Sequence, residues 1–264
     1  MTQVIRDRLY RRHRFPADVI AHAVWLYLRF PLSLRMVEDL LAARGIIVSH
    51  QTVRLWVEKF GRHFANDIQR RSAGRLGDKW YLDEVVISIG GEKHWLWRAV
   101  DQDGFVLDVL VQSRHNTKAA KRLMRKLMKG QGHSPRVMIT DKLRSYGAAK
   151  RDIMPGVEHR SNKGLNNRAE NSHQPTTRRR ERIMKGFKST RHLQRFVSIH
   201  DPVANLFHIP RHEISSDHHR ELRTEAMQIW NEIARLQTAQ VKAAPDILDR
   251  CPLTLRCPAS SCPI

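Results

Sequence analysis

The spacing of apolar residues changes at Trp80, and this change constrains the fold more than any other feature of the chain. Before Trp80, apolar side chains such as Val19, Ile20, Ala23 and Val24 recur at the three-and-four spacing of a buried helix face. After it, short runs rich in β-branched and aromatic residues alternate with helical segments. We therefore predict an α/β protein, α+β overall, in which a helical unit precedes a mixed-sheet unit.

Three short helices are expected between residues 16 and 64. Pro31 ends the first, Ser33 caps the second, Gly45 ends the second, and Ser49 caps the third. A glycine at the turn and a polar, basic start to the last helix suggest a helix-turn-helix, the alternative being a small helical bundle with solvated charges. Glutamine and arginine suit bidentate contacts to base edges in the major groove. The candidate base-contacting residues are His50, Gln51, Thr52 and Arg54.

Beyond Trp80 the predicted order of elements is β-β-β-α-β-α-β-α, which fits a mixed sheet packed by helices. The expected strands are 80–90, 94–100, 105–112, 136–140 and 157–160, and the expected helices are 115–130, 144–154 and one that starts near Asn166. The polar, glycine-containing segment 67–79 reads as a linker.

The charge of the chain points to a polyanionic partner. The sequence holds 47 Lys and Arg against 26 Asp and Glu, a net charge of +21, and nucleic acid is the first candidate. Residues 160–195 carry eleven basic and only two acidic side chains. A generally basic surface is the alternative reading. No apolar run is long enough for a membrane span and no signal peptide is evident, so we expect a soluble, cytoplasmic protein without a membrane partner.

Three carboxylates stand out by position. Asp83 lies inside a strand, Asp141 directly follows a buried strand, and Glu170 lies early in a helix in a segment with almost no other acid. Carboxylates gathered from separate elements repel one another unless a cation holds them, and hard oxygen ligands suit Mg²⁺ or Mn²⁺. The alternatives are a strand-edge residue, a helix N-cap and a first-turn helix acid, respectively. A turn and an outward strand position explain three further acids without metal: Asp101, Asp103 and Asp108.

Three blocks in order carry a family resemblance: YLDE at 81–84, ITDK at 139–142 and NNRAENSHQP at 166–175. Behind an N-terminal helix-turn-helix, they resemble the DDE-type transposases of bacterial insertion sequences, especially the small ones that join replicons into cointegrates. The resemblance runs from about residue 15 to about residue 235. It implies a ribonuclease-H-like catalytic core with Asp83, Asp141 and Glu170 as the metal-binding triad, and two Mg²⁺ or Mn²⁺ ions as cofactors. Asn166, Asn167 and Arg168 would orient the glutamate or touch DNA.

The same resemblance implies an order of domains along the chain. Residues 1–66 would be the DNA-binding domain, 67–79 the linker, 80–210 the catalytic core, and 211–264 a helical and then disordered tail. The enzyme would bind terminal inverted repeats and cleave and transfer DNA strands. Its partners would be double-stranded repeat and target DNA and further copies of itself, in a homodimer or larger assembly on the bacterial nucleoid. A basic stretch would grip strand backbone: Arg178, Arg179, Arg180, Arg182, Lys185, Lys188, Arg191 and Arg195.

Two departures from the family pattern leave alternatives open. Thr177 stands where the family has a basic residue two turns after the glutamate, so that role either belongs to Arg178 or Arg179 or is displaced. The tail beyond about residue 236 does not resemble the family, and the spacing of its three cysteines matches no standard zinc site. The alternative functions are a decayed transposase that only binds DNA, and a structure-specific nuclease on the same core.

Overall fold

The computed structural model describes residues 7–141, 143–162, 164, 166–173, 186–209 and 214–236. In that part of the chain, every helix is too short or too polar to cross a membrane. The basic residues at 178–182 and Lys185, which the sequence predicts to bind DNA, lie outside the described residues, as do the three cysteines.

The N-terminal unit is helical, and the predicted caps are confirmed. A 3₁₀ turn, η1 (Arg8–Tyr10), precedes α1 (Ala17–Arg29), α2 (Leu34–Ala42) and α3 (His50–Trp56). The Ser33 hydroxyl accepts the backbone N–H of Met36, and the Ser49 hydroxyl accepts that of Thr52. Gly45, in the turn after α2, has a φ of 74°, which favours glycine because it lacks a Cβ. These serines and this glycine set where the second and third helices begin and end.

The third helix is longer than the sequence indicates. A π-helical turn, η2 (Val57–Gly61), joins α3 to α4 (Arg62–Ser72), so the helix continues without a break into the predicted linker. Residues 67–72 are helical rather than extended, because Ile68 is 2% exposed and packs in the apolar core. The prediction of a linker over 67–79 is therefore wrong for these six residues.

The second unit contains a five-stranded mixed sheet in the order β3-β2-β1-β4-β5. β1 pairs antiparallel with β2 and parallel with β4, β2 pairs antiparallel with β3, and β4 pairs parallel with β5. Three helices are interspersed, and the predicted order of elements and the predicted α/β class are confirmed. This strand order and these directions are those of the ribonuclease-H-like fold. The elements are β1 (Lys79–Ile89), β2 (Glu92–Val100), β3 (Val106–Gln112), α5 (Thr117–Gln131), β4 (Val137–Thr140), α6 (Arg144–Ile153), β5 (Glu158–Ser161) and α7 (Asn167–His173).

Helices cover both faces of this sheet. Trp80 and Leu82 of β1 pack in one apolar cluster with Leu123 of α5 and Tyr146 of α6. Because strand residues alternate between faces, Tyr81 points the other way, where it joins a cluster that includes Ala169 of α7. The two faces therefore have different neighbours, and a side chain on β1 meets either α5 and α6 or α7.

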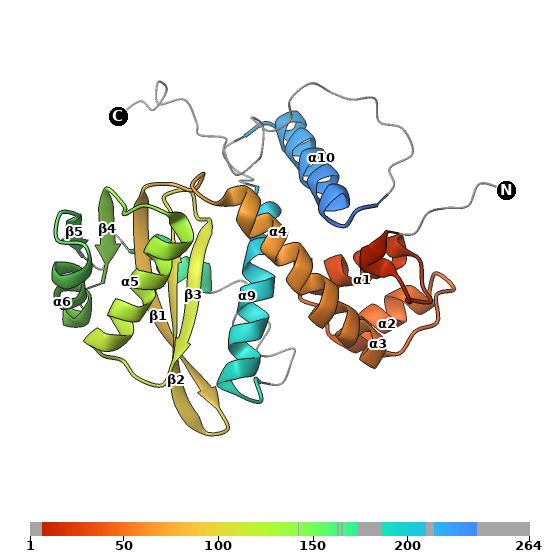
Figure 1. Cartoon of the computed structure of the whole chain (residues 1–264), viewed down its shortest axis with the longest axis horizontal. Coiled ribbons are helices and arrows are strands. Elements are labelled where there is room, and N and C mark those ends of the chain that lie inside the picture. The colour runs from red at the N-terminus through yellow and green to blue at the C-terminus, as the bar shows by residue number, and fades with distance from the viewer. Residues whose placement is uncertain are drawn as a thin grey trace.

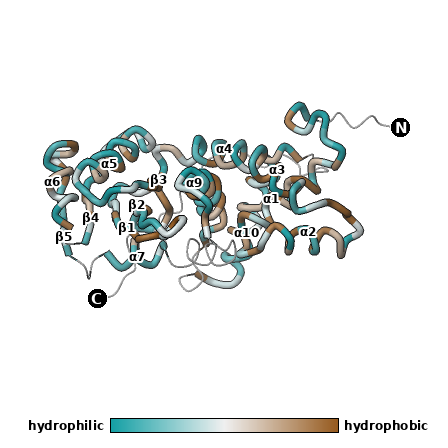
Figure 2. Tube along the Cα trace, turned by 90° about the horizontal axis from the view of Figure 1, so that it is seen from below, coloured by the Kyte–Doolittle hydropathy of each residue, from teal (hydrophilic) through white to brown (hydrophobic). Residues whose placement is uncertain are grey.

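Helix α9 (Thr190–Leu206) lies between the sheet and the N-terminal helices, as Figures 1 and 2 show from two directions. One apolar core includes α9, the N-terminal helices and residues of β1, β2 and β3. Gly61 of η2 permits close approach, since a Cβ there would lie 3.1 Å from Ile199 of α9. The side-chain amides of Gln194 and Asn205 each hydrogen-bond twice to backbone of the edge strand β3, so α9 also covers the free edge of the sheet.

The last described helix, α10 (Ser216–Ile233), returns to the N-terminal unit. Tyr10 donates its hydroxyl to the carbonyl oxygen of Ala234 at 2.7 Å. Trp230, which is 2% exposed, meets Phe64 of α4 edge to face with a ring-centroid distance of 5.1 Å. The helix after the sheet-containing unit thus completes the core of the first unit rather than forming a separate tail.

We predict that Trp230→Ala lowers the free energy of unfolding by about 3 to 5 kcal/mol, because it leaves a cavity against Phe64. Chemical denaturation measures this loss. The control is Gln228→Ala on the exposed side of the same helix, which should change stability by less than about 0.5 kcal/mol. Equal effects of the two substitutions would show that α10 does not belong to this core.

Candidate active site

The parallel pairing of β1 with β4 brings two of the three predicted acids to neighbouring positions. Leu82 is in register with Thr140, so Asp83 and Asp141 follow one step further along adjacent strands. Tyr81 and Ile139, two residues earlier on each strand, share the cluster that includes Ala169 of α7. By strand alternation, Asp83 and Asp141 belong to the same side of the sheet as α7, on strands spaced about 4.8 Å apart.

The third acid lies on the helix that crosses this face. Residues 166, 169 and 173 are buried at 0%, 0% and 2% exposure, and this spacing marks the side of α7 that packs on the sheet. Glu170 lies one helical turn after residue 166 and one turn before residue 173, and its side chain is half-buried. Arg168 and Asn171 are exposed. Helical geometry therefore turns Glu170, rather than its polar neighbours, toward β1.

Hydrogen bonds fix the backbone around each acid. The buried Asn166 side chain donates Nδ2–H to the carbonyl oxygen of Leu82 at 3.0 Å, so the start of α7 is attached beside Asp83. The hydroxyls of Thr140 and Ser161 both donate to the backbone oxygen of Asp141, at 2.8 and 2.9 Å. This arrangement supports an orienting role for Asn166.

His173 is a neighbour of Asp83 that the sequence interpretation missed. Its Nε2 lies 3.3 Å from Oδ2 of Asp83, and the imidazole is 2% exposed. Burial lowers the pKa of His173, although the nearby Asp83 carboxylate acts in the opposite direction. The ring is therefore neutral at pH 7. Its i+3 spacing from Glu170 is the signal that could have identified it.

The chemistry of the three acids suits a hard divalent cation. All are oxygen donors, two are adjacent in register, and the third is on the helix side that faces them. Among the residues that the structure describes, no three Asp, Glu, His or Cys side chains already form a ligand group. The Asp83 carboxylate contacts His173 instead. Donor type and register fit a metal.

The acids next to the triad have other partners. Glu84 points to the opposite face, as strand alternation predicts, where Tyr146 donates its hydroxyl to Oε2 at 2.6 Å and His115 Nε2 lies 2.8 Å from Oε1. Burial raises the pKa of Glu84, and these two partners offset part of that rise. Asp101 accepts three backbone N–H groups in its turn, and Asp108 pairs with Lys126 at 2.6 Å. These contacts explain the competing acids without metal.

The residues predicted to contact bases differ in exposure. Gln51 and Arg54 are exposed on α3. His50 and Thr52 are half-buried: His50 Nδ1 lies 3.4 Å from Glu38 of α2, and the Thr52 hydroxyl is 3.1 Å from that of Ser49. The exposed face also includes Leu55, which is 64% exposed although its apolar side chain would be expected on the buried side of the helix.

The start of α9 adds basic side chains beside α3. Arg195 lies 3.7 Å from Glu58 of η2. Burial lowers the pKa of His192, and the positive charges of Arg195, Arg54 and Lys188 lower it further, which requires that these groups be close. Lys188 and Arg195, two of the predicted backbone-binding residues, therefore lie near Arg54 of the candidate recognition helix. Arg191, the third, lines the same cavity as Arg195.

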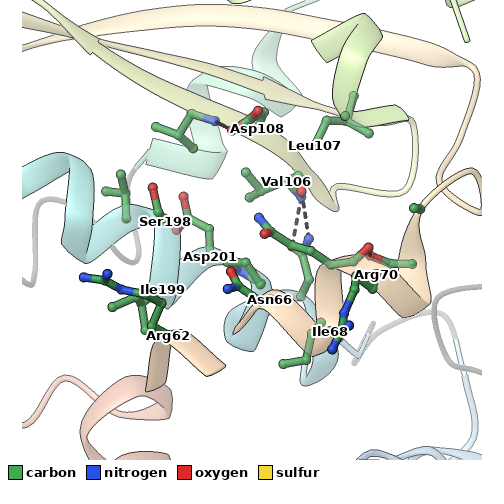
Figure 3. A pocket seen from close by; sticks show the side chains of 18 of the residues that line it. Arg62, Asn66, Ile68, Arg70, Val106, Leu107, Asp108, Ser198, Ile199 and Asp201 are labelled. Atoms are coloured by element: carbon green, nitrogen blue, oxygen red, sulfur yellow. Dashed lines mark hydrogen bonds between the residues drawn. The ribbon is translucent and has the colours of Figure 1, made fainter. Parts of the chain in front are cut away.

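Two cavities border these surfaces. A cavity of about 1260 Å³ separates α4, β3 and α9, and Figure 3 shows Arg62 and Asn66 of α4 lying across from Ser198 and Asp201 of α9. A second, of about 810 Å³, lies where α7, α9 and the sheet meet, and its lining includes Tyr81 of β1 and Arg98 of β2. The lining also includes Arg29 of α1, His208, and the two predicted DNA-binding residues Asn167 and Arg168. In the motif around Glu170, Asn166 is thus hydrogen-bonded to the sheet, whereas Asn167 and Arg168 line the second cavity.

Comparison with known proteins gives a consistent result for the same residues. Residues 77–209 match a protein family described as a DDE domain. Two Staphylococcus aureus proteins are similar: the transposase for insertion sequence element IS257 in transposon Tn4003, and the transposase for insertion sequence-like element IS431mec of strain Mu50. Each is 32% identical over 169 residues, which span 62% of this chain and 75% of the relative. Uncharacterized protein pYV0051 of Yersinia pseudotuberculosis is 31% identical over 77 residues, 28% of this chain and 72% of that protein.

Among solved structures, the simian T-cell lymphotropic virus intasome in complex with PP2A regulatory subunit B56 gamma contains a similar chain. The alignment has a TM-score of 0.41 and 13% identity, and covers 66% of this chain and 61% of that chain. A TM-score at this level carries no conclusion, so the ribonuclease-H-like topology stands on strand order and direction alone.

We predict that Tyr146→Phe destabilises the fold by about 1 to 3 kcal/mol at pH 8, because the buried Glu84 carboxylate loses its hydroxyl donor. The loss should be smaller at pH 4.5, close to the ordinary carboxyl pKa. In the fold, Glu84 has a raised pKa and retains its proton there, and a protonated carboxyl needs the donor less. The difference between variant and wild type should therefore grow as the pH rises through the folded-state pKa of Glu84. Denaturant unfolding at both pH values checks this, and a pH-independent difference would contradict it.

Proposed function

The chain belongs to the DDE transposases of bacterial insertion sequences, and from this premise we propose that it binds the terminal inverted repeats of its element and catalyses metal-dependent DNA strand cleavage and strand transfer. The observation that carries the proposal is the β1–β4 register, which aligns Asp83 with Asp141 on the side of the sheet that α7 covers. Glu170 faces the same side. Such enzymes are polynucleotidyl transferases that generally use divalent metal ions.

Asp83, Asp141 and Glu170 would hold two Mg²⁺ or Mn²⁺ ions. When bound, such a pair of ions activates a water or a 3′-hydroxyl and stabilises the leaving oxygen of a phosphodiester. The role of the other side chains would be to hold the backbone segments that carry the three acids in place. Asn166 attaches α7 to β1, and the hydroxyls of Thr140 and Ser161 hold the backbone of Asp141. Asp83 has two carboxylate oxygens, so it could bind a metal while Oδ2 keeps its contact with His173.

Recognition of the repeat would begin on α3. Gln51 and Arg54 have the exposure and the donor geometry to contact base edges in a major groove. Leu55 adds an exposed apolar side chain on the same helix, which suits contact with a thymine methyl group. The half-buried His50 and Thr52 would act mainly by shaping the start of the helix, with Ser49 and Glu38 as their partners.

Phosphate contacts would extend this interface onto the core. Lys188, Arg191 and Arg195 follow α3 onto the start of α9, and Arg62 of α4 shares a cavity wall with Arg191 and Arg195. Because α9 shares one apolar core with α3 and α4, a duplex held by α3 would meet these side chains in a fixed orientation. The exposed Asn167 and Arg168 would contact the strand near Glu170. Arg178, Arg179, Arg180, Arg182 and Lys185 belong to the same proposed set.

Both ends of an element must be held together for strand transfer, so we include a homodimer or larger assembly in the proposal. Target DNA would be the second nucleic-acid substrate.

A labelled duplex of the element's terminal repeat tests the catalytic part. We predict a nick at the 3′ end of the element that requires Mg²⁺ and is abolished by EDTA. Asp83→Asn, Asp141→Asn and Glu170→Gln should each lower the cleavage rate at least about a thousandfold, since each removes a metal ligand, while repeat binding stays within a few fold.

The matched control for this assay is Asp108→Asn. This acid is on β3, on the opposite face, and pairs with Lys126, so its loss should leave the cleavage rate within a few fold. Tight, repeat-specific binding with no nick in the wild type would instead favour a decayed transposase that only binds DNA. Cleavage without repeat preference would favour a structure-specific nuclease.

A salt titration of repeat binding tests the DNA interface. Arg191→Gln should weaken binding to repeat and unrelated DNA alike and lower the slope of log K against log salt by about one, as expected for one lost phosphate contact. Arg54→Gln should instead lower the preference for the repeat. Arg125→Gln, an exposed arginine on α5, carries the same charge change and should leave the slope unaltered. An equal change of slope for Arg125→Gln would indicate a general charge effect.

A further inference from the structure

A buried ion pair connects β2 to α9 under the candidate active site. Arg98 is 1% exposed and its Nη2 lies 3.2 and 3.0 Å from the two carboxylate oxygens of Asp201. Asp201 is 4% exposed and also accepts from His200, whose Nδ1 is 3.0 Å from Oδ1. Burial acts to raise the pKa of Asp201, but Arg98 and His200 together hold that pKa below its ordinary value, so the carboxylate is ionised.

The energetics of such a pair do not account for its presence. Removing two charges from water costs free energy that their attraction often fails to recover, and apolar residues of similar volume are frequently as stable. Sequence periodicity would place an apolar residue at 98, in the strand segment HWLWRAV. Stability alone therefore does not explain why Arg98 and Asp201 are present, and a second role of this ion pair is to be sought in its other contacts.

The third contact of Arg98 indicates that role. Its Nη1 donates to the carbonyl oxygen of Ser172 at 2.8 Å, in the last turn of α7. Ser172 is close to the end of the described part of α7, Asn167–His173. Asn166 attaches the first end of α7 to β1, and Arg98 attaches the last turn to β2. Glu170 lies between these two attachments.

Arg98 is also the cross-strand partner of Asp83. The guanidinium therefore lies beside one predicted metal ligand while it holds the helix that carries another. Asp201 on α9 fixes the guanidinium by accepting hydrogen bonds from its Nη2. The arginine fork, with donors in one plane, can satisfy Asp201 and Ser172 at once, and a lysine ammonium cannot reproduce this geometry.

We propose that Arg98, held by Asp201, is a positioning residue that sets the distance between Glu170 on α7 and Asp83 on β1. The proposal rests on the proposed function only for the identity of the two ligands. It assigns to Arg98 no contact with DNA or with the reacting atoms. Helix α7 keeps its place on the sheet because its backbone at Ser172 is bound to a guanidinium that α9 fixes.

The test compares two variants with the full-length protein. Arg98→Lys keeps the charge but loses the fork. The double variant R98M/D201L replaces the pair with apolar side chains of similar size, which guards against unfolding through an unpaired buried charge. Arg136→Lys is the matched control, because Arg136 forms a surface pair with Asp78 at the other end of β4.

Two readouts are needed. The first is the rise in Tm on adding Mn²⁺, which reports binding to the folded state and does not depend on DNA cleavage. The second is the single-turnover nicking rate at saturating repeat DNA. We expect both variants to fold and to bind the repeat within about twofold, to lose most of the Mn²⁺-induced rise in Tm, and to nick at least about tenfold more slowly. Arg136→Lys should match the wild type in all respects.

A stable R98M/D201L variant with wild-type Mn²⁺ stabilisation and a wild-type nicking rate would overturn the proposal, because Arg98 would then serve stability alone. The proposed function fails separately: wild-type protein that is stabilised by Mn²⁺ but does not nick the repeat removes the catalytic proposal. In that case loss of the Mn²⁺ effect in Arg98→Lys still supports the positioning role, and its retention contradicts it.

Discussion

The packing of α9 is the interaction on which the rest of the structure depends. Its apolar residues join the N-terminal helices and one face of the sheet in a single core, and Gly61 lets η2 approach the helix closely. Gln194 and Asn205 supply the hydrogen bonds that the edge of β3 would otherwise lack. The same helix presents Asp201 to Arg98 and so connects the candidate DNA-binding unit to the helix that carries Glu170. Recognition and catalysis, as proposed, share one rigid element.

The polar groups of the core divide between the two faces of the sheet. On the side of α7, Asp83 is surrounded by His173, Arg98 and, one strand away, Asp141. On the other side, Glu84 is held by Tyr146 and His115. Two adjacent acids of one strand therefore have different surroundings: Asp83 lies on the side of α7, and Glu84 is held by two hydrogen bonds on the side of α5 and α6. Strand alternation alone produces this separation.

Much of the fold could be predicted because the signals are local. Ser33 and Ser49 cap helices through their own hydroxyls, and the alternation of apolar residues around Asp83 defines a strand. The linker prediction was wrong at 67–72 because polar composition suggests a loop, whereas one buried residue, Ile68, keeps α4 helical. Arg98 and Asp201 were missed for a related reason: they are 103 positions apart, and neither has a local signal for its partner.

The sequence by itself determined the order of the elements, the switch from helical to strand periodicity, the basic character and the three acids in their motif contexts, since each depends on neighbours within a few residues. The tertiary structure decided which acids share a face, which basic residues lie together beside α3, and that α10 packs against Phe64. Those outcomes depend on strand register and on contacts between distant segments. The physical reason is that burial and hydrogen-bond geometry are properties of the assembled core, which no local pattern of residues specifies.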